Sequence, residues 1–214
     1  GWIEVNLNAD GTVIAGGSSF PIRYVFRPDG STFNELLGSD PGIAYDVSPA
    51  GNIAVGWTMF ESTKFAFRWV ASRPPLERME RLSDPSGAWI ESAALGVSSD
   101  GSIIVGSGRQ SNQNAVFIWD SDHGMRDLAS VLEHDFCLDL TGWTLAAASG
   151  ISDNGLTIVG YGTGPGGSTE AWIARITPLG ETDVDRDGTP NCADGCPNDP
   201  NKIEPGVCGC NVPD

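Results

Sequence analysis

The sequence predicts an all-β fold, namely a β-propeller-like array of four-stranded blades, followed by a small irregular module at the C-terminus. Two observations support this prediction. Residues 1–178 repeat one strand–turn–strand pattern four times, and self-similarity on this length scale is typical of propeller blades. After residue 182, aspartate, cysteine and proline replace the apolar pattern, which indicates a second module with almost no packed core. We therefore expect about four blades in this chain.

The first half of each repeat is a predicted β-hairpin. Asp10-Gly11, Asp100-Gly101 and Asn154-Gly155 are strong hairpin signals, because Asn, Asp and Gly tolerate the positive φ that such turns need. The second repeat keeps only the glycine, in Ala50-Gly51. We expect the strands of each hairpin to pair within their own repeat. The four aligned segments are "VNLNADGTVIAGG", "YDVSPAGNIAVGW", "LGVSSDGSIIVGS" and "SGISDNGLTIVGY".

The second half of each repeat predicts two further strands. An aromatic strand reads "YVFRP", "AFRWV", "VFIWD" and "AWIAR", and a short segment follows it in three repeats as "FNELL", "LERMERL" and "MRDLASVL". One such sheet cannot bury both of its faces, so we expect the sheets to stack around an axis. The recurring tryptophans of the third strand should then pack between blades, rather than bind a ligand; they are Trp69, Trp119 and Trp172.

The last repeat stops after "EAWIARI" without a fourth strand. A solenoid or a sandwich is the alternative architecture. The long four-stranded repeat disfavours the solenoid, because the coils of a solenoid are usually shorter. Because residue 2 already begins a first strand, no strand is left over to complete the last blade. We therefore expect the chain to form part of a larger ring.

The composite pattern of the repeats resembles a known family. The sequence "VSSDGSIIVG", followed by "VFIW" and "GMRDL", is similar to bacterial extracellular HAF-type repeats, and "LDLTGWTLAAASGISDNGLTIVGYGTGPGGSTEAWIA" resembles their characteristic last repeat. The resemblance covers residues 1–176. It implies a secreted or surface-displayed repeat domain, and it implies no enzymatic activity.

Composition and charge limit the classes of function. The 214 residues suffice for one or two domains, and the formal net charge is −16. Such a surface repels phosphates, so we expect no binding to nucleic acid. No apolar run approaches the roughly 18 residues that a membrane helix needs, so we expect no membrane span in this chain. The chain begins with glycine and shows no signal peptide, which suggests a mature product or a fragment.

Four of the five cysteines lie in the last 23 residues. Their spacing lacks the two CxxC pairs of a zinc ribbon and favours disulfides, which indicate an oxidising, extracellular or cell-surface location. We expect two disulfides, with Cys208 and Cys210 each reaching back to Cys192 or Cys196 in one of the possible connectivities. Cys137, in the apolar segment "FCLDL", is expected to remain a buried thiol.

The segment "DVDRDGTPNCAD" predicts a cation-binding loop. Its alternating aspartates place three carboxylates on one side of a loop, and the glycine after them permits a sharp turn. Carbonyl, amide and carboxylate oxygens then fill EF-hand-like positions 1, 3, 5, 7, 9 and 12, which suit Ca²⁺ better than Mg²⁺. A solvated acidic linker is the alternative. The predicted ligands are Asp183, Asp185, Asp187, the Thr189 carbonyl, Asn191 and Asp194.

Prolines after this loop exclude the long helix of an EF-hand. The segment instead resembles a thrombospondin type-3 repeat, a family that wraps its chain around calcium ions and links it by disulfides. The resemblance implies that the acidic residues and Asn191 are ligands, that Cys192 and Cys196 are structural cysteines, and that Asp199 and Asn201 form an incomplete second site. The predicted domains are residues 1–178 for the repeats, 179–182 for a linker and 183–214 for the calcium-binding module.

The sequence contains no recognisable catalytic motif. His123 and His134 are expected to be exposed, neither lies in an HExxH frame, and "GTGPGGS" lacks the lysine of a phosphate-binding loop and suits a hairpin. We expect a non-catalytic binding or adhesion module with a calcium-stabilised stalk, whose partner is an extracellular protein or a glycan. A purely structural surface component, or a propeller hydrolase or lyase acting on extracellular polysaccharide, is the alternative.

Overall fold

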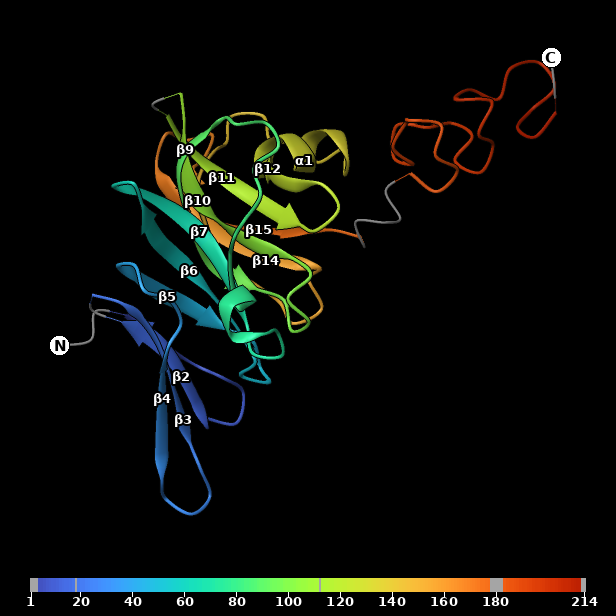
Figure 1. Ribbon diagram of the computed structural model, residues 1–214. Helices are drawn as coiled ribbons and strands as arrows, with labels where there is room; N and C mark the ends of the chain where they lie inside the picture. Colours follow the sequence, from blue (N-terminus) through green and yellow to red (C-terminus); the bar gives the residue numbers. More distant parts are fainter. Residues whose placement is uncertain (1–3, 18, 112, 178–182, 213–214) are drawn as a thin grey trace.

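The computed structural model describes residues 4–17, 19–111, 113–177 and 183–212, and in them fifteen strands form four antiparallel sheets (Figure 1). Sheet 1 contains β1 (Glu4–Leu7), β2 (Val13–Gly17), β3 (Pro21–Phe26) and β4 (Thr32–Leu36). Sheet 2 contains β5 (Gly42–Val47), β6 (Ile53–Phe60), β7 (Thr63–Val70) and β8 (Met79–Arg81). Sheet 3 contains β9 (Trp89–Val97), β10 (Ile104–Gln110), β11 (Gln113–Asp120) and β12 (Gly124–Asp127). Sheet 4 contains β13 (Thr144–Ile151), β14 (Thr157–Thr163) and β15 (Thr169–Arg175).

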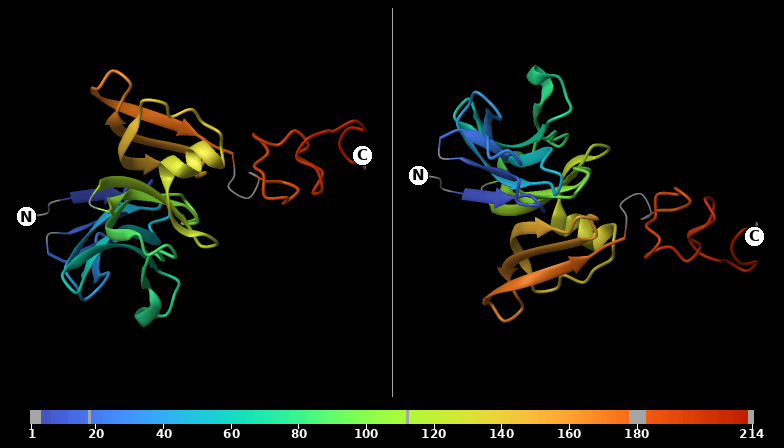
Figure 2. Two further views of the ribbon diagram at one scale, coloured as in Figure 1. Left: turned by 90° about the horizontal axis from the view of Figure 1, so that it is seen from above. Right: turned by 90° about the horizontal axis from the view of Figure 1, so that it is seen from below.

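Each sheet is built from one sequence repeat, as the hairpin pattern predicts. The strands pair in chain order within every sheet. The first strands of neighbouring sheets contact each other, so the four sheets lie face to face in an arc (Figure 2). Sheet 4 has three strands among the described residues, which agrees with the missing fourth segment of the last repeat.

The four hairpin turns share one geometry. Gly11, Gly51, Gly101 and Gly155 all have φ between +70° and +74°, whereas the residue before each glycine has negative φ. Only the glycine therefore needs the left-handed conformation, and Ala50 is tolerated in the second turn for this reason. In the last three turns, the hydroxyl of the serine before the turn also accepts a hydrogen bond from the backbone N–H five residues further along the chain. Ser98 accepts from Ile103 at 3.0 Å in this way.

A second glycine in each repeat permits close packing of the first two strands. A Cβ atom on Gly106 would lie 2.1 Å from the Ala93 carbonyl oxygen and 2.7 Å from the Phe117 ring. Gly56 and Gly160 are just as close to the carbonyl oxygens of their first strands, at 1.9 and 2.0 Å. These contacts explain the glycine that follows the apolar run of the second strand in the second, third and fourth repeats.

The core lies in three clusters, one between each pair of neighbouring sheets. Trp69 and Trp119 are almost fully buried in two of them, which confirms that they pack between sheets. Trp172 also packs against the cluster between sheets 3 and 4, but it occupies a different strand position from Trp69 and Trp119. It pairs with Gly160, the position at which sheets 2 and 3 carry Phe67 and Phe117.

Helix α1 (Leu128–His134) follows β12 and was not expected as a helix. Its N-cap is Asp127, whose carboxylate accepts a hydrogen bond from the Ser130 N–H at 2.8 Å. Leu128, Val131 and Leu132 then lie on one buried face against sheets 3 and 4. The helical spacing of these three apolar residues is the signal in the segment "MRDLASVL". A short 3₁₀ helix, η1 (Pro75–Glu77), precedes β8.

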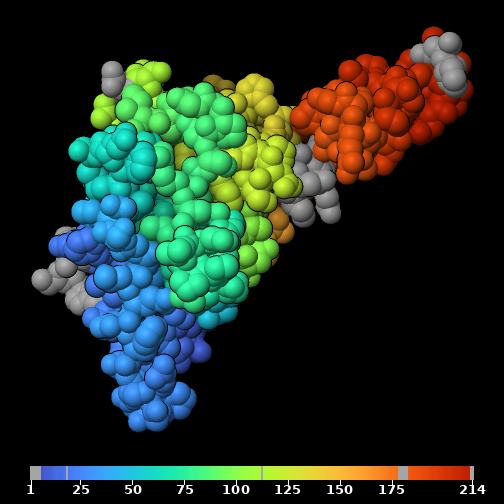
Figure 3. Space-filling model, in the orientation of Figure 1, coloured from blue at the N-terminus to red at the C-terminus, as the bar shows by residue number. Residues whose placement is uncertain are grey.

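The C-terminal arm, residues 183–212, extends away from the sheets as irregular chain (Figures 1 and 3). The predicted linker at 179–182, and the ends of the chain at 1–3 and 213–214, lie outside the described residues. Val184 and Val207 are among its exposed apolar residues, so the arm has little core of its own.

The disulfides correct the expected pairing. One joins Cys137 to Cys192 across 55 residues, and the other joins Cys196 to Cys210. The prediction that Cys137 is a buried thiol is therefore wrong, as is the prediction that two disulfides form among the last four cysteines. Cys137 is exposed in the turn after α1, where it can reach the arm, whereas Cys208 is exposed and belongs to neither disulfide.

Candidate metal centre and binding surface

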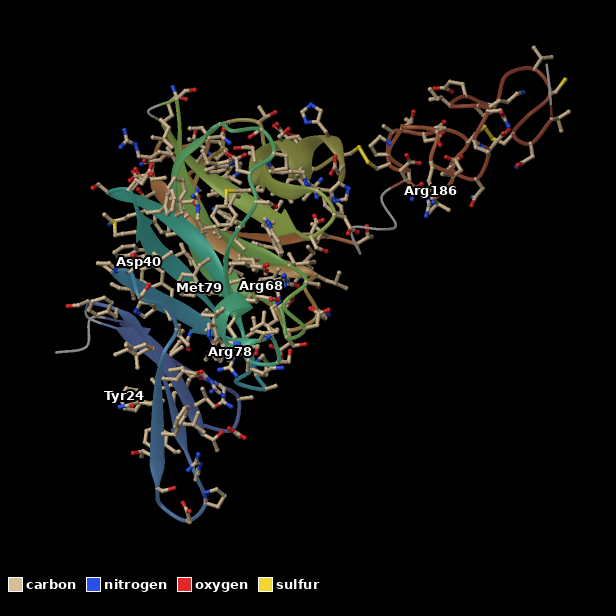
Figure 4. The ribbon with its side chains drawn as sticks, viewed as in Figure 1. Tyr24, Asp40, Arg68, Arg78, Met79 and Arg186 are labelled. Carbon is tan, nitrogen blue, oxygen red and sulfur yellow. A yellow bond between two sulfur atoms is a disulfide. The ribbon has the colours of Figure 1, made fainter. Side chains whose placement is uncertain are left out.

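The alternating aspartates of the arm gather as the sequence predicts. Asp183, Asp185 and Asp187 are half-buried, while Val184 and Arg186 between them are exposed. One carboxylate oxygen from each of the three aspartates lies within 4.8 Å of the others. Arg186 adopts φ +63°, and its side chain points away from the arm (Figure 4). The three carboxylates thus lie together, and the guanidinium of Arg186 lies apart from them.

Backbone N–H groups fix the orientation of these carboxylates. Both oxygens of Asp183 accept hydrogen bonds, from the N–H of Arg186 at 2.7 Å and of Gly188 at 3.1 Å. Oδ1 of Asp185 accepts one from the Asp187 N–H at 3.2 Å, and Oδ1 of Asp187 accepts one from the Thr189 N–H at 2.7 Å. Each hydrogen bond holds one carboxylate in place and leaves the other oxygen of Asp185 and Asp187 to face inward.

Three buried carboxylate oxygens have no hydrogen-bond partner among the described residues. They are Oδ2 of Asp185, of Asp187 and of Asp194. Asp194 is 8% exposed, and its Oδ1 accepts a hydrogen bond from the Cys196 N–H at 2.7 Å. Desolvation, together with the charges of Asp187 and Asp194, raises the pKa of Asp185. Unpartnered buried acceptors of like charge are costly, and a cation bound by the group of Asp183, Asp185 and Asp187 would satisfy those of Asp185 and Asp187. The predicted ligand Asp194 is not in that group of described residues.

The remaining predicted ligands have different roles in the structure. Asn191 Oδ1 accepts a hydrogen bond from the Val184 N–H at 3.0 Å, which closes the loop. Asp199 is 6% exposed, and its two oxygens accept hydrogen bonds from the backbone N–H groups of Asn201 at 3.2 Å and Asn211 at 2.6 Å. Asp199 therefore shapes the chain, and among the described residues it is not in the carboxylate group that could hold an ion.

A shallow polar groove lies on the body, where sheets 2, 3 and 4 meet, and has a volume of about 290 Å³. Lys64 from β7 lies over the Trp57 ring at 4.6 Å from its centroid, while Tyr161 from β14 contributes a half-exposed ring. Glu91 pairs with Arg109 at 3.3 Å and is the only carboxylate among the described residues that line the groove. The sequence signal for this groove was the aromatic residue Tyr161, directly after the glycine of the second strand, where the first and third repeats have glycine and serine.

The two histidines are exposed, as predicted. His123 Nδ1 lies 2.8 Å from an oxygen of Asp120, whose other oxygen pairs with Arg126 at 3.0 Å. Burial opposes ionisation of Asp120, but the His123 hydrogen bonds and the Arg126 charge keep its pKa below the usual value. His134 contacts Ser130 of its own helix: its Nδ1–H donates to the Ser130 carbonyl at 2.9 Å and lies 3.4 Å from the Ser130 hydroxyl. These contacts stabilise local turns.

Comparison with solved structures identifies the architecture of the body. The putative TolB from Agrobacterium tumefaciens superposes with a TM-score of 0.57 at 15% identity over 83% of this chain. TolB from Acinetobacter baumannii superposes with a TM-score of 0.55 at 16% identity over 82% of this chain. The body has a β-propeller fold. At these identities the likeness extends to the fold alone.

The chain spans 62% of the length of the first of these structures and 41% of the second. No protein-family model and no curated protein matches the sequence. In the part of the chain that the structure describes, neither helix has the length and apolar character of a membrane-spanning segment.

Proposed function

We propose that this chain is a non-catalytic extracellular binding or adhesion module, in which a β-propeller body carries an arm that folds around Ca²⁺. The observation that supports the arm's role is the group of Asp183, Asp185 and Asp187, in which the buried Oδ2 atoms of Asp185 and Asp187 have no hydrogen-bond partner among the described residues. The two disulfides support an oxidising location. HAF-type and thrombospondin type-3 character remain proposals that rest on the sequence resemblance.

Calcium is the cation that the ligand set favours. The available donors are carboxylate, amide and carbonyl oxygens, which suit hard cations. Calcium accepts six to eight such ligands with loose geometry, whereas magnesium requires a near-ideal octahedron. An irregular loop with few other contacts can adjust its ligands around the larger ion. The ion would then offset the mutual repulsion of the aspartates, and its binding would contribute directly to folding of the arm.

The polar groove is the proposed binding surface for an extracellular glycan. Lys64 and the Tyr161 ring combine a charge, hydrogen-bonding groups and an aromatic face, which suit a polar, ring-shaped ligand. Glycoside hydrolysis ordinarily needs two carboxylates, and among the described residues this groove offers only Glu91, already paired with Arg109. The groove therefore favours binding over the alternative of a propeller hydrolase.

Electrophoresis through gels that contain a neutral or a carboxylated polysaccharide tests the groove. We expect one of the two to retard the wild-type protein and the variant Lys64→Ala to migrate without retardation. Lys202→Ala, a change of equal charge on the arm, should leave retardation unchanged. Equal migration of the wild type in all gels would contradict glycan binding at this surface.

Limited proteolysis with and without a calcium chelator tests the arm. Chelation should make residues 183–212 sensitive to protease while the body resists, because the apolar clusters consist of residues of the body. The variant Asp185→Ala should behave in calcium as the wild type behaves in chelator, with the melting of the body unchanged. Fragments must be resolved under reducing conditions, because Cys137–Cys192 would otherwise hold the arm on the body. Simultaneous melting of body and arm on chelation would refute the proposal.

A further inference from the structure

Neighbouring sheets of the body pack by one repeated rule. We call the face of a sheet that packs on the next sheet in the chain its leading face, and the opposite face its following face. In the junction of sheets 1 and 2, the leading face contributes Val13 and Ala15, and the following face contributes Ala54, Phe67 and Trp69. The junction of sheets 2 and 3 uses the same positions, namely Ile53 and Val55 against Ile104, Phe117 and Trp119. The junction of sheets 3 and 4 places Val105 and Ile118 against Ile158 and Ala174.

An arginine reinforces the first two junctions. Arg23, on the leading face of sheet 1, donates to the Gly51 carbonyl at 2.8 Å and lies 5.3 Å from the Trp69 ring centroid. Arg68, one sheet further along, donates to the Gly101 carbonyl at 3.0 Å and lies 4.7 Å from the Trp119 centroid (Figure 4). In the third junction, Ile118 occupies the arginine position, so an apolar side chain also serves there.

The first and last sheets each expose one half of this interface. On the following face of sheet 1, Leu7 is 57% exposed, although Val47 and Val97 are buried at the same position in sheets 2 and 3. Tyr24 on this face points away from the body (Figure 4). On the leading face of sheet 4, Val159 is 42% exposed and Ile173 is 57% exposed. Strand register places Val159 and Ile173 at the positions that Val55 and Arg68 occupy in sheet 2.

The turn glycines show the same incompleteness. A Cβ atom on Gly51, Gly101 or Gly155 would lie within 2.5 to 2.8 Å of a side chain on the preceding sheet. A Cβ atom on Gly11 would have nothing within 4 Å. The first turn therefore offers the surface that the other three turns use for packing. In the three formed junctions, the turn glycine contacts the residue two positions after the turn glycine of the preceding sheet. The equivalent residue of sheet 4 is Thr157, which is partly exposed.

We propose that two copies of this chain associate head to tail, with the leading face of sheet 4 in each copy packed on the following face of sheet 1 in the other. One chain holds both halves of an interface that it already forms three times internally. Charge also matches, since Arg175 lies on the exposed face of sheet 4 and Asp10 in the exposed turn of sheet 1. Two such contacts close a ring that leaves neither face open.

Sedimentation equilibrium of the full chain tests this association. We expect the wild type to sediment at twice the mass of one chain. Leu7→Asp and Ile173→Asp each put a charge into both junctions and should raise the dimer dissociation constant by about tenfold or more. Leu76→Asp is the matched control, because Leu76 is 99% exposed on η1, away from both faces, and it should leave the dimer unchanged.

Mixing the two variants distinguishes a head-to-tail dimer from a symmetric one. A heterodimer of Leu7→Asp and Ile173→Asp has one junction without either substitution, so the mixture should associate more tightly than either variant alone. A monomeric wild type would overturn the proposal. A dimer that only Leu7→Asp weakens would also overturn it, because sheet 1 would then pair with sheet 1. Circular dichroism should show that each variant retains the fold.

Discussion

Replacement of Arg68 by methionine tests the packing between sheets most sharply. The Arg68 side chain is 14% exposed and makes three contacts: with the Gly101 carbonyl at 3.0 Å, with Glu80 at 2.7 Å, and with the Trp119 ring. A hydrogen bond from a charged group contributes about 1.5 kcal/mol or more, and a partly buried cation–π contact about 0.5 to 2 kcal/mol. Glu80 keeps Arg73 as a partner. Methionine preserves the apolar stem, so the expected loss is about 2 to 4 kcal/mol.

Thermal unfolding followed by circular dichroism measures this loss. For a domain of this size, 1 kcal/mol corresponds to roughly 2 to 4 °C in melting temperature, so Arg68→Met should melt about 10 °C below the wild type. Arg27→Met is the control, because Arg27 is exposed and lies 5.8 Å from the centroid of the exposed Phe33 ring. It should shift the free energy of unfolding by less than about 0.5 kcal/mol. Equal melting of the two variants would refute the role given to the inter-sheet arginine.

Three further predictions follow from other contacts. Gly106→Ala should destabilise the body by about 2 kcal/mol or more in urea unfolding, because the new Cβ atom would meet a β9 carbonyl oxygen at 2.1 Å, whereas Gly166→Ala, with its nearest neighbour at 3.9 Å, should be nearly neutral. Hydrogen bonds from Ser102 lower the pKa of Asp100 below 3.8, so its stabilising contribution is present above that value and is lost as the pH falls through the lower folded pKa. Asp100→Asn should therefore weaken the acid dependence of the urea midpoint, and an unchanged pH profile would contradict this. With a specific protease site placed at residues 179–182, cleavage should release the arm from Cys137→Ser on a non-reducing gel and leave it attached in the wild type.

Local sequence chemistry predicted the hairpins well. Each turn glycine needs positive φ for reasons that lie within four residues of it, so Gly11 and Gly155 marked their turns without tertiary information. The alternation of aspartates likewise marked Asp183, Asp185 and Asp187 as one group, because all three lie within a single short loop that turns at Arg186 and Gly188. These predictions depended on short-range geometry, and the structure agrees with them.

Contacts between segments that are distant in the sequence could not be predicted from local sequence patterns. Cys137 pairs with Cys192 because the turn after α1 brings it to the edge of the body from which the arm departs, and no local pattern encodes that approach. Crowding of cysteines in the last residues suggested pairs among themselves, which proved wrong for Cys192 and Cys208. The groove around Lys64 and Tyr161 was also missed, because it combines residues from three sheets.

Calorimetric titration of the full chain with Ca²⁺ is the most direct test of the central claim, that the arm folds around a bound calcium ion. The account predicts saturable heat for the wild type and for Asp40→Asn, an exposed aspartate of the body. It predicts that Asp185→Asn loses this heat or binds at least about tenfold more weakly, because Asp185 contributes one of the three unpartnered oxygens. Absence of calcium uptake by the wild type, or equal uptake by Asp185→Asn, would contradict the claim.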